Sequence, residues 1–307
     1  MSEQSLPLAA RSRRRLRRRK TLTVLVAIAP FVLFCAALVG GPLVQVVRMS
    51  LSNIQLLATG FQFTWGGLVN YREVVGDPLS WQAIGRTAFF VVVTVAASLV
   101  VGMIVALLVY RSVALLKVAR NVLIWPAVIA PVVVSLMWLL ILSPTVGGLN
   151  KVLETVGLPG QAWLNTGHGA MASLVVVDVW HWSPVVFLVL YTALQAIDAD
   201  LLDAARVDGT NGGQLFRHVL LPLLAPAIAA VAVVRVIMGV KVFDEMYLLT
   251  AGGPNGATTL VSQRVQLWFF QDLRFGTAAA FSVLVVVLTA VVLAVAIGVR
   301  TYAGRQS

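Results

Sequence analysis

The chain has 307 residues, of which 59% are hydrophobic and only 11% are charged. So few polar residues cannot cover a water-soluble globule of this length, so the composition excludes an ordinary soluble domain and predicts a protein that lies in lipid. Eight of the cations behind the net charge of +11 crowd into residues 11–20. This placement makes the charge a signal of membrane orientation and argues against a nucleic-acid-binding protein.

The first 20 residues form a basic tail with little to bury, and we expect it to lie in the cytoplasm against anionic lipid headgroups. Residues 22–47 follow as an apolar run that is too long for a signal peptide and lacks a clear small-residue cleavage site. We therefore predict an uncleaved first membrane span. Cys35 lies in this run, and a single cysteine excludes a disulfide framework and a cysteine-based metal site.

Five more apolar runs are each close to the roughly 20 residues that a helix needs to cross a bilayer. They cover residues 87–110, 122–142, 171–194, 219–240 and 278–299. The chain is thus predicted to be an all-α, polytopic membrane protein with six transmembrane helices in one domain, residues 21–300, and a short cytoplasmic tail at 301–307. Prolines within the runs predict bent helices around a cavity. They are Pro126, Pro131, Pro184, Pro222 and Pro226.

The distribution of lysine and arginine predicts which side of the membrane each loop faces. With the N-terminus inside, fifteen of these residues lie in inner segments and six in outer loops. This bias places both termini and the loop of residues 195–222 in the cytoplasm. The outer loops, residues 53–85, 143–170 and 241–277, are long, which suggests that something docks from outside.

No catalytic motif is present in the sequence. The Gly-x-x-x-x-Gly-Lys-Ser/Thr phosphate cradle, His-Glu-x-x-His and Gly-x-Ser-x-Gly are all missing, and the histidines at 168, 181 and 218 are scattered. We therefore expect no active site, no metal and no cofactor on this chain. If ATP drives the protein, it is hydrolysed on another polypeptide.

A polar, helix-forming stretch lies between the fourth and fifth apolar runs. Residues 203–209 read Asp-Ala-Ala-Arg-Val-Asp-Gly, and Val219-Leu220-Leu221-Pro222 follows after nine residues. Good helix formers over 201–207 and a stop with positive φ at Gly209 predict a short helix lying across the membrane surface. Gly212 and Gly213 are expected to give slack before the next span.

This spacing resembles the cytoplasmic coupling loop of ATP-binding-cassette importer permeases. The usual opening residue of that loop is Glu, and Asp203 keeps its carboxylate. The resemblance assigns ATPase coupling to Asp203, Ala204, Ala205, Asp208, Gly209, Leu221 and Pro222.

A second stretch directly after the fifth run narrows the resemblance. Residues 242–259 resemble the Phe-Asp-x-x-Tyr-x-Leu-Thr-x-Gly-Gly-Pro segment of carbohydrate-uptake permeases, of the type of the larger maltose permease subunit. Together the two stretches extend the resemblance over nearly all of residues 22–300. It implies the importer permease fold and a sugar as the solute.

The same resemblance implies an assembly in the plasma membrane of a prokaryote. Its members are this chain, a second related permease, two ATPase subunits that use ATP and Mg²⁺, and an extracytoplasmic solute-binding protein. Closure of the ATPases would rock the helical cores between inward-facing and outward-facing states, the usual solution to alternating access.

Helical geometry and the resemblance together predict a substrate pathway. Asp178 lies about 10 Å below the outer end of the fourth run and Arg235 about 8 Å below that of the fifth, so the two charges share a depth. The predicted pathway residues are Asp178, Trp180, His181, Trp182 and Val185 on the fourth run, and Arg235, Met238, Gly239 and Val242 on the fifth. A charge inside a span must be paired or face water, so Asp178 and Arg235 either form a structural ion pair, with outward snorkelling of Arg235 as a variant, or bind sugar hydroxyls beside a tryptophan ring.

Two alternatives from other classes stay open. A permease for another solute, such as phosphate, a polyamine or a metal complex, would share the coupling loop, and a cavity rich in one sign of charge would favour it. A channel or secondary transporter would need no ATPase, so the presence of bound ATPase subunits distinguishes it from an importer.

Overall fold

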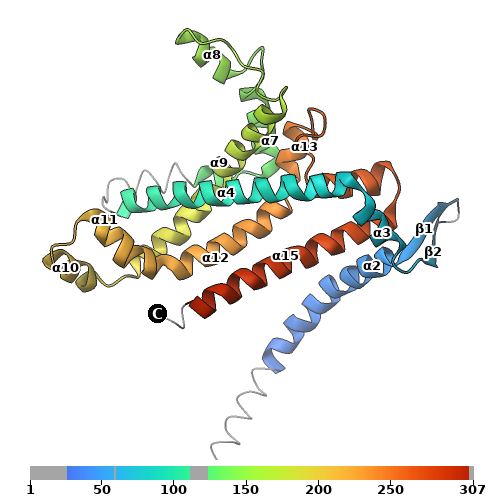
Figure 1. The fold of residues 1–307 in the computed structure, drawn as a ribbon, viewed down its shortest axis with the longest axis horizontal. Coiled ribbons are helices and arrows are strands. Elements are labelled where there is room, and N and C mark those ends of the chain that lie inside the picture. The colour runs from blue at the N-terminus through green and yellow to red at the C-terminus, as the bar shows by residue number, and fades with distance from the viewer. Residues whose placement is uncertain (1–25, 59, 111–123, 304–307) are drawn as a thin grey trace, which may run out of the picture.

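The computed structural model describes residues 26–58, 60–110 and 124–303 of the chain. Within these ranges the fold is a bundle of long helices, most of which follow the long axis of the molecule (Figure 1). Five helices are long and apolar enough to cross a membrane. They are Val26–Ser50, Pro78–Tyr110, Gly167–Gln195, Gly212–Val240 and Phe275–Gly298. The predicted helical membrane fold is confirmed, whereas the count of six spans and the cytoplasmic termini stay predictions. The basic tail lies outside the described residues.

The first span contains a π-helical turn, η1 (Ala36–Gly40), followed by α2 (Gly41–Ser50). None of the residues in its most hydrophobic window is buried inside the protein. Its main packing partner is α15 (Phe275–Ala303), the last helix of the chain, and Figure 1 shows the two side by side at one edge of the bundle. The first span is therefore a lateral arm and not part of the core.

The loop after the first span contains a β-hairpin that the prediction of an all-α chain omitted. Strands β1 (Ser52–Leu57) and β2 (Gly60–Trp65) pair antiparallel, with Ser52 opposite Trp65. A short helix, α3 (Val69–Gly76), leads from the hairpin into α4 (Pro78–Tyr110). β-Branched and aromatic residues in alternation, such as Phe61, Phe63 and Trp65, favour a strand, and treating the segment as an irregular loop overlooked that signal.

The third predicted span, residues 122–142, is not one continuous helix. The structure divides it into α6 (Trp125–Val128) and α7 (Pro131–Ile141), with extended backbone at Ile129 and Ala130. Pro131 causes the break, because the ring disfavours a helical conformation at the residue before it and provides no backbone N–H. The predicted bend is therefore a full interruption. Residues 111–123, which precede it, lie outside the described part.

The core is built around the contact between α4 and α9 (Gly167–Gln195). Gly102 of α4 makes this close approach possible, since a Cβ placed there would lie 2.7 Å from Val186 Cγ1 and 3.0 Å from the Phe187 amide nitrogen. α12 (Leu221–Val240) packs against both helices. The buried side chains Ala106, Leu190 and Leu224 join the three in one apolar cluster.

We expect Gly102→Ala to destabilise the protein by about 1–3 kcal/mol, because the added methyl overpacks the α4–α9 interface. Gly85→Ala is the matched control on the same helix, since a Cβ at Gly85 meets nothing within 4 Å. The free energy of unfolding in lipid bicelles should fall for the first variant and stay level or rise slightly for the second. Equal values for both would contradict the close packing.

Short helices cover one end of the bundle. In chain order, α13 (Asp244–Leu249), α14 (Val261–Gln266) and the π-helical η4 (Leu267–Gln271) follow α12 and precede α15. Figure 1 shows α13 beside α7, and α8 (Gly148–Thr155), which follows α7 in the chain, projecting from the bundle. Arg264 pairs with Asp77 at 2.8 Å and lies over the Trp268 ring at 4.4 Å. These contacts fasten the short helices to the start of α4.

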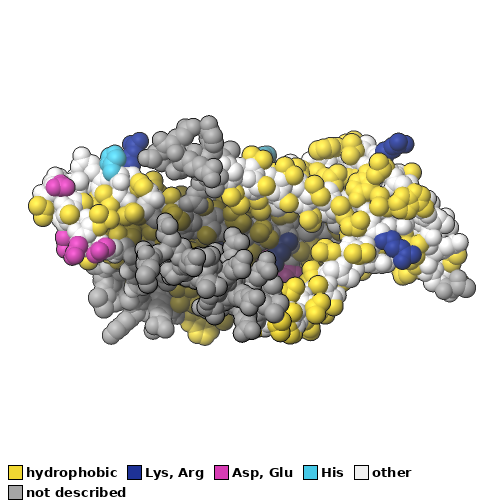
Figure 2. Space-filling view, turned by 90° about the horizontal axis from the view of Figure 1, so that it is seen from below, with side chains coloured by type: hydrophobic (Ala, Val, Ile, Leu, Met, Phe, Trp, Pro, Cys, Tyr) yellow, Lys and Arg dark blue, Asp and Glu magenta, His cyan; other side chains and the backbone are white. Residues whose placement is uncertain are grey.

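The surface follows the expected membrane pattern. On the face shown in Figure 2, hydrophobic side chains cover much of the described surface from the centre toward the right. Acidic side chains gather at the left end, where Figure 1 places α10 (Ala199–Val207). The polar loop that the sequence singled out therefore lies beyond one end of the apolar bundle.

Candidate functional site

The predicted coupling helix is present as α10, which ends at Val207. Gly209 adopts φ +79°, and the Thr210 amide donates to the Ala205 carbonyl at 3.3 Å, the pattern of a left-handed helix cap. The Thr210 hydroxyl donates to the same carbonyl at 2.6 Å. The positive φ predicted for Gly209 is thus confirmed.

Burial separates an anchor from a presented face on α10. Leu202 is buried among Leu194 and Leu220, which ties the helix to the ends of α9 and α12. Asp203, Ala204 and Val207 are exposed, Val207 to 87%, and Ala205 is half-buried. Asp208, Gly209, Leu221 and Pro222 are exposed as well. A short helix fixed from one side presents small and apolar side chains on the other.

Gly212 and Gly213, before the fifth span, are helical and do not form the flexible link that we predicted. Asn211 and Gln214 form a capping box. The backbone N–H of Gln214 donates to Asn211 Oδ1 at 2.9 Å, and the backbone N–H of Asn211 donates to Gln214 Oε1 at 2.9 Å. Helix α11 (Gly212–Gln214) then continues through the π-helical η3 (Leu215–Leu220) into α12. The loop therefore joins the span by an unbroken helix that can transmit a displacement.

Asp178 of α9 and Arg235 of α12 form an ion pair in the interior, through Oδ1 and Nη2. They are 1% and 0% exposed, and Arg235 Nε also donates to Ser98 Oγ of α4 at 3.3 Å. Arg235 Nη1 is buried and has no hydrogen-bond partner among the described residues. The equal depth derived from helical rise is borne out by this contact, and the pair joins α4, α9 and α12.

His181, one turn further along α9, bridges two other elements. Its Nδ1 lies 3.1 Å from Oε1 of Glu245 on α13, and its Nε2 lies 3.2 Å from the carbonyl oxygen of Ile129. The side chains of His181 and Glu245 are both buried. The Ile129 carbonyl lies in the break between α6 and α7, so the imidazole binds the interrupted third span.

The other predicted pathway residues differ in burial and in what they contact. Trp182 is half-buried and stacks on His181, with ring centroids 4.4 Å apart. Val185 and Met238 are half-buried, and Gly239 is buried with its Cα facing Val91 of α4. Val242 was predicted on the fifth span, but α12 ends at Val240 and Val242 lies in the following turn. The predicted placement of Val242 on the helical face of the fifth span is therefore wrong.

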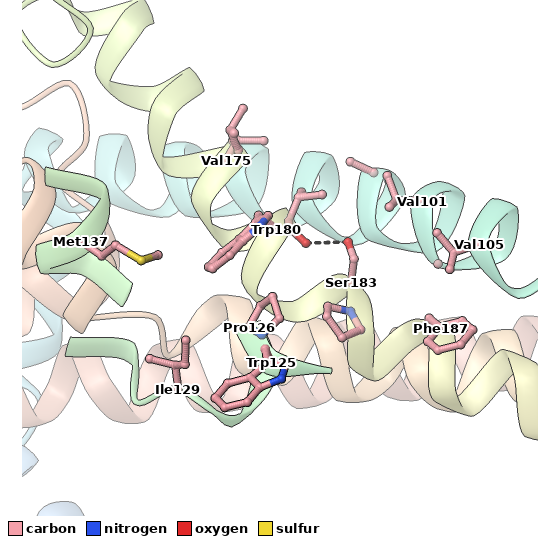
Figure 3. A pocket seen from close by; sticks show the side chains of 15 residues that line it. Val101, Val105, Trp125, Pro126, Ile129, Met137, Val175, Trp180, Ser183 and Phe187 are labelled. Carbon is pink, nitrogen blue, oxygen red and sulfur yellow. Dashed lines mark hydrogen bonds between the residues drawn. The ribbon is translucent and has the colours of Figure 1, made fainter. Parts of the chain in front are cut away.

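Trp180 lines a cavity of about 650 Å³ between α4, α9, α6 and α7. Figure 3 shows it beside Met137 of α7 and the Trp125–Pro126 pair of α6, with Ser183 and Phe187 further along α9. The lining is almost entirely apolar, and the Ser183 hydroxyl donates to the backbone carbonyl of Val179. Asp178 and Arg235 do not line this cavity.

A second cavity, of about 570 Å³, shares Val175 and Val176 with the first and extends to the other end of α9. Its lining contains two side chains that can carry positive charge, Arg86 and His168. Together the two cavities follow the groove between α4 and α9.

Sequence reasoning missed two members of the buried polar cluster. Glu245 lies beyond the fifth span in the chain, and Ser98 is one of several hydroxyl residues within the second. The signal for Glu245 was a carboxylate directly before the apolar run Met246 to Leu249. An acid there needs a buried partner if the stretch returns to the core.

Comparison with known proteins adds the following similarities. The family described as "Binding-protein-dependent transport system inner membrane component" matches residues 98–301. A probable ABC transporter permease, y4oQ of Sinorhizobium fredii, is 34% identical over 284 residues, 92% of each chain. The trehalose/maltose transport system permease MalF of Thermococcus litoralis is 32% identical over 72% of this chain and 75% of its own. The crystal structure of a bacterial alginate ABC transporter with its alginate pentasaccharide-bound periplasmic protein has a chain of similar fold, with TM-score 0.77, 19% identity and coverage of 91% and 93%.

Proposed function

Because this chain belongs to the family of binding-protein-dependent transport system inner membrane components, we propose that it is the permease subunit of an ATP-driven sugar importer. It forms half of the translocation pathway and couples to a separate ATPase subunit through residues 201–218. A sugar as the solute is supported by the relative named for trehalose and maltose transport and by the maltose-type segment at residues 242–259.

The proposed assembly contains a second related permease, two ATPase subunits that use ATP and Mg²⁺, and an extracytoplasmic solute-binding protein. Dependence on a binding protein is part of the family description, and the alginate transporter of similar fold was crystallised with its periplasmic protein. In this assembly the chain itself binds no cofactor. Both of its termini and α10 lie in the cytoplasm of a prokaryote.

The observation that carries the coupling role is the geometry of α10. A helix of nine residues, fixed by Leu202 and closed by Gly209, presents Ala204 and Val207 at the end of the bundle. Small side chains allow a partner backbone to approach closely, and Val207 offers an apolar anchor. α10 contacts η3, and the continuous helix from α11 through η3 into α12 carries the motion of the ATPase into the bundle.

Within the bundle, the groove between α4 and α9 provides the proposed path for the sugar. Trp180 offers an aromatic face to a sugar ring. Asp178 and Arg235 are paired in this conformation, and we propose that they contact sugar hydroxyls when the helices part, with Trp182 nearby. Arg235 Nη1 is buried and has no hydrogen-bond partner in the described part of the chain, which supports a donor held ready for an oxygen ligand.

We expect Ala204→Asp to abolish co-purification of ATPase subunits with the tagged chain and, with it, sugar uptake. The added carboxylate would be buried without a partner in the ATPase groove. Ala199→Asp is the matched control, because Ala199 is exposed at the N-terminal end of the same helix, where an acid is favourable. The readouts are mass spectrometry of the purified complex and uptake of radiolabelled trehalose and maltose.

Each readout addresses a different alternative. If no ATPase co-purifies even with the unchanged chain, the protein is a channel or secondary transporter. If the ATPases bind but neither disaccharide enters while another solute does, the importer is not a trehalose or maltose importer. Equal behaviour of the two alanine variants would exclude α10 as the coupling element.

A further inference from the structure

The contact between His181 and Ile129 determines where one proton of the imidazole lies. The Ile129 carbonyl oxygen can only accept a hydrogen bond, and at 3.2 Å it faces His181 Nε2. The helix does not satisfy this carbonyl, because the first amides of α7, from Val133 and Val134, bind the Ala130 carbonyl instead. Nε2 must therefore carry a hydrogen, which it donates to Ile129.

The contact on the other side of the ring then needs a second proton. A neutral imidazole with hydrogen on Nε2 presents a bare lone pair at Nδ1, and an ionised carboxylate only accepts. Nδ1 and Glu245 Oε1 lie 3.1 Å apart with both groups buried, a distance at which two acceptors repel each other. One proton must lie between them, either on the ring or on the acid.

The charge of the surroundings leads to the same result independently. Within the part of the chain that the structure describes, the charged side chains that interact with His181 or with its neighbour Asp178 are Arg235 on α12 and Glu245 on α13. α6 and α7 contain no charged residue, and α4 contributes the neutral Ser98 at this depth. The opposite charges of Asp178 and Arg235 cancel. Without an extra proton, Glu245 would therefore leave one uncompensated negative charge inside the bundle, and burying such a charge costs free energy.

We propose that Glu245 and His181 hold a single shared proton, and that this proton positions the broken third span. Ile129 is both the residue bound by His181 and part of the cavity wall, together with Trp125 and Pro126 of α6. Glu245 is a positioning residue that acts through His181. Without this proton Nδ1 and Oε1 would be two facing acceptors, so the contact would open and release the wall of the cavity.

Nitrogen-15 NMR of the histidine-labelled full chain in lipid bilayers tests the proton directly. The chain has three histidines, and His168→Gln and His218→Gln assign the signals. Near neutral pH, the His181 signals are expected to show hydrogen on Nε2 and a hydrogen-bonded proton at Nδ1. Hydrogen on Nδ1 alone, or a bare Nδ1 without a hydrogen bond, would overturn the proposal.

Glu245→Gln is the decisive variant, because its amide N–H replaces the shared proton and leaves the cluster neutral. Uptake by the assembled transporter should therefore stay within about twofold of that of the unchanged protein. Glu245→Ala should lower uptake about tenfold or more, since His181 loses its partner. Glu154→Gln, at an exposed acid on α8, is the matched control and should leave uptake unaltered.

The two measurements separate this proposal from the proposed function. If the chain transports no sugar, the NMR result still decides where the proton lies. If uptake by Glu245→Gln falls about tenfold or more, as expected for Glu245→Ala, the shared proton does not position the third span. Poor folding of Glu245→Ala alone affects neither comparison.

Discussion

Replacing Arg235 with glutamine is expected to lower the free energy of unfolding by about 3–5 kcal/mol, because it leaves the Asp178 carboxylate buried without its counter-charge. Arg235 is fully buried, and its guanidinium binds Asp178 and Ser98 on two other helices. Unfolding in lipid bicelles, followed by tryptophan fluorescence, measures the change.

The double variant Asp178→Asn, Arg235→Gln provides the control for this prediction. Removing both charges should restore much of the stability that either single change loses, so the double-mutant cycle should give a coupling energy of about 2–3 kcal/mol. Additive losses would mean that the pair does not hold the helices. If the single variants instead assemble with ATPase activity that responds to the binding protein but lose uptake, their main role is contact with the sugar.

The second large effect is expected in the coupling loop, where Gly209→Val should abolish transport while the protein still inserts. Gly209 has φ +79°, and a β-branched residue in this conformation costs roughly 1–2 kcal/mol or more. That cost is enough to unwind the end of α10, whose cap depends on the Thr210 amide reaching the Ala205 carbonyl. Uptake normalised to the amount of inserted protein is the readout.

Gly212→Val is the matched control for this loop. Gly212 begins α11 without a positive φ, and a Cβ there meets nothing within 4 Å, so the same substitution is accommodated. We expect near-normal uptake from this variant. Transport by Gly209→Val at the level of Gly212→Val would show that the shape of the α10 cap is unimportant for coupling.

The membrane helices could be predicted from the sequence because both helix length and apolar composition respond directly to the thickness of the bilayer. The same regularity explains why counting residues placed Asp178 and Arg235 at one depth, since a helix rises about 1.5 Å per residue whatever its neighbours are. The turn at Gly209 was predictable because few other residues tolerate a positive φ.

Counting residues along a helix gave wrong positions where the chain changes direction. Residues after Val240 were assigned to an outer loop, yet α13 returns to the core, where Met246 and Leu249 pack against Phe90 and Leu174. This return brings Glu245 to His181 and removes Val242 from the face of the fifth span. Contacts of this kind depend on tertiary packing, so the sequence pattern within the segment does not predict them.

The lateral position of the first span has a consequence for biosynthesis. Its main packing partner, α15, begins at Phe275, about 225 residues after α2 ends at Ser50. At roughly 5–20 residues per second, the ribosome delivers that partner on the order of 10–45 s later. Throughout this interval the arm must persist in the bilayer with lipid alone around it, which a span that leaves its apolar surface outside the core is suited to do. The last helix to be synthesised, α15, is thus the one that packs against the first span and holds it in place.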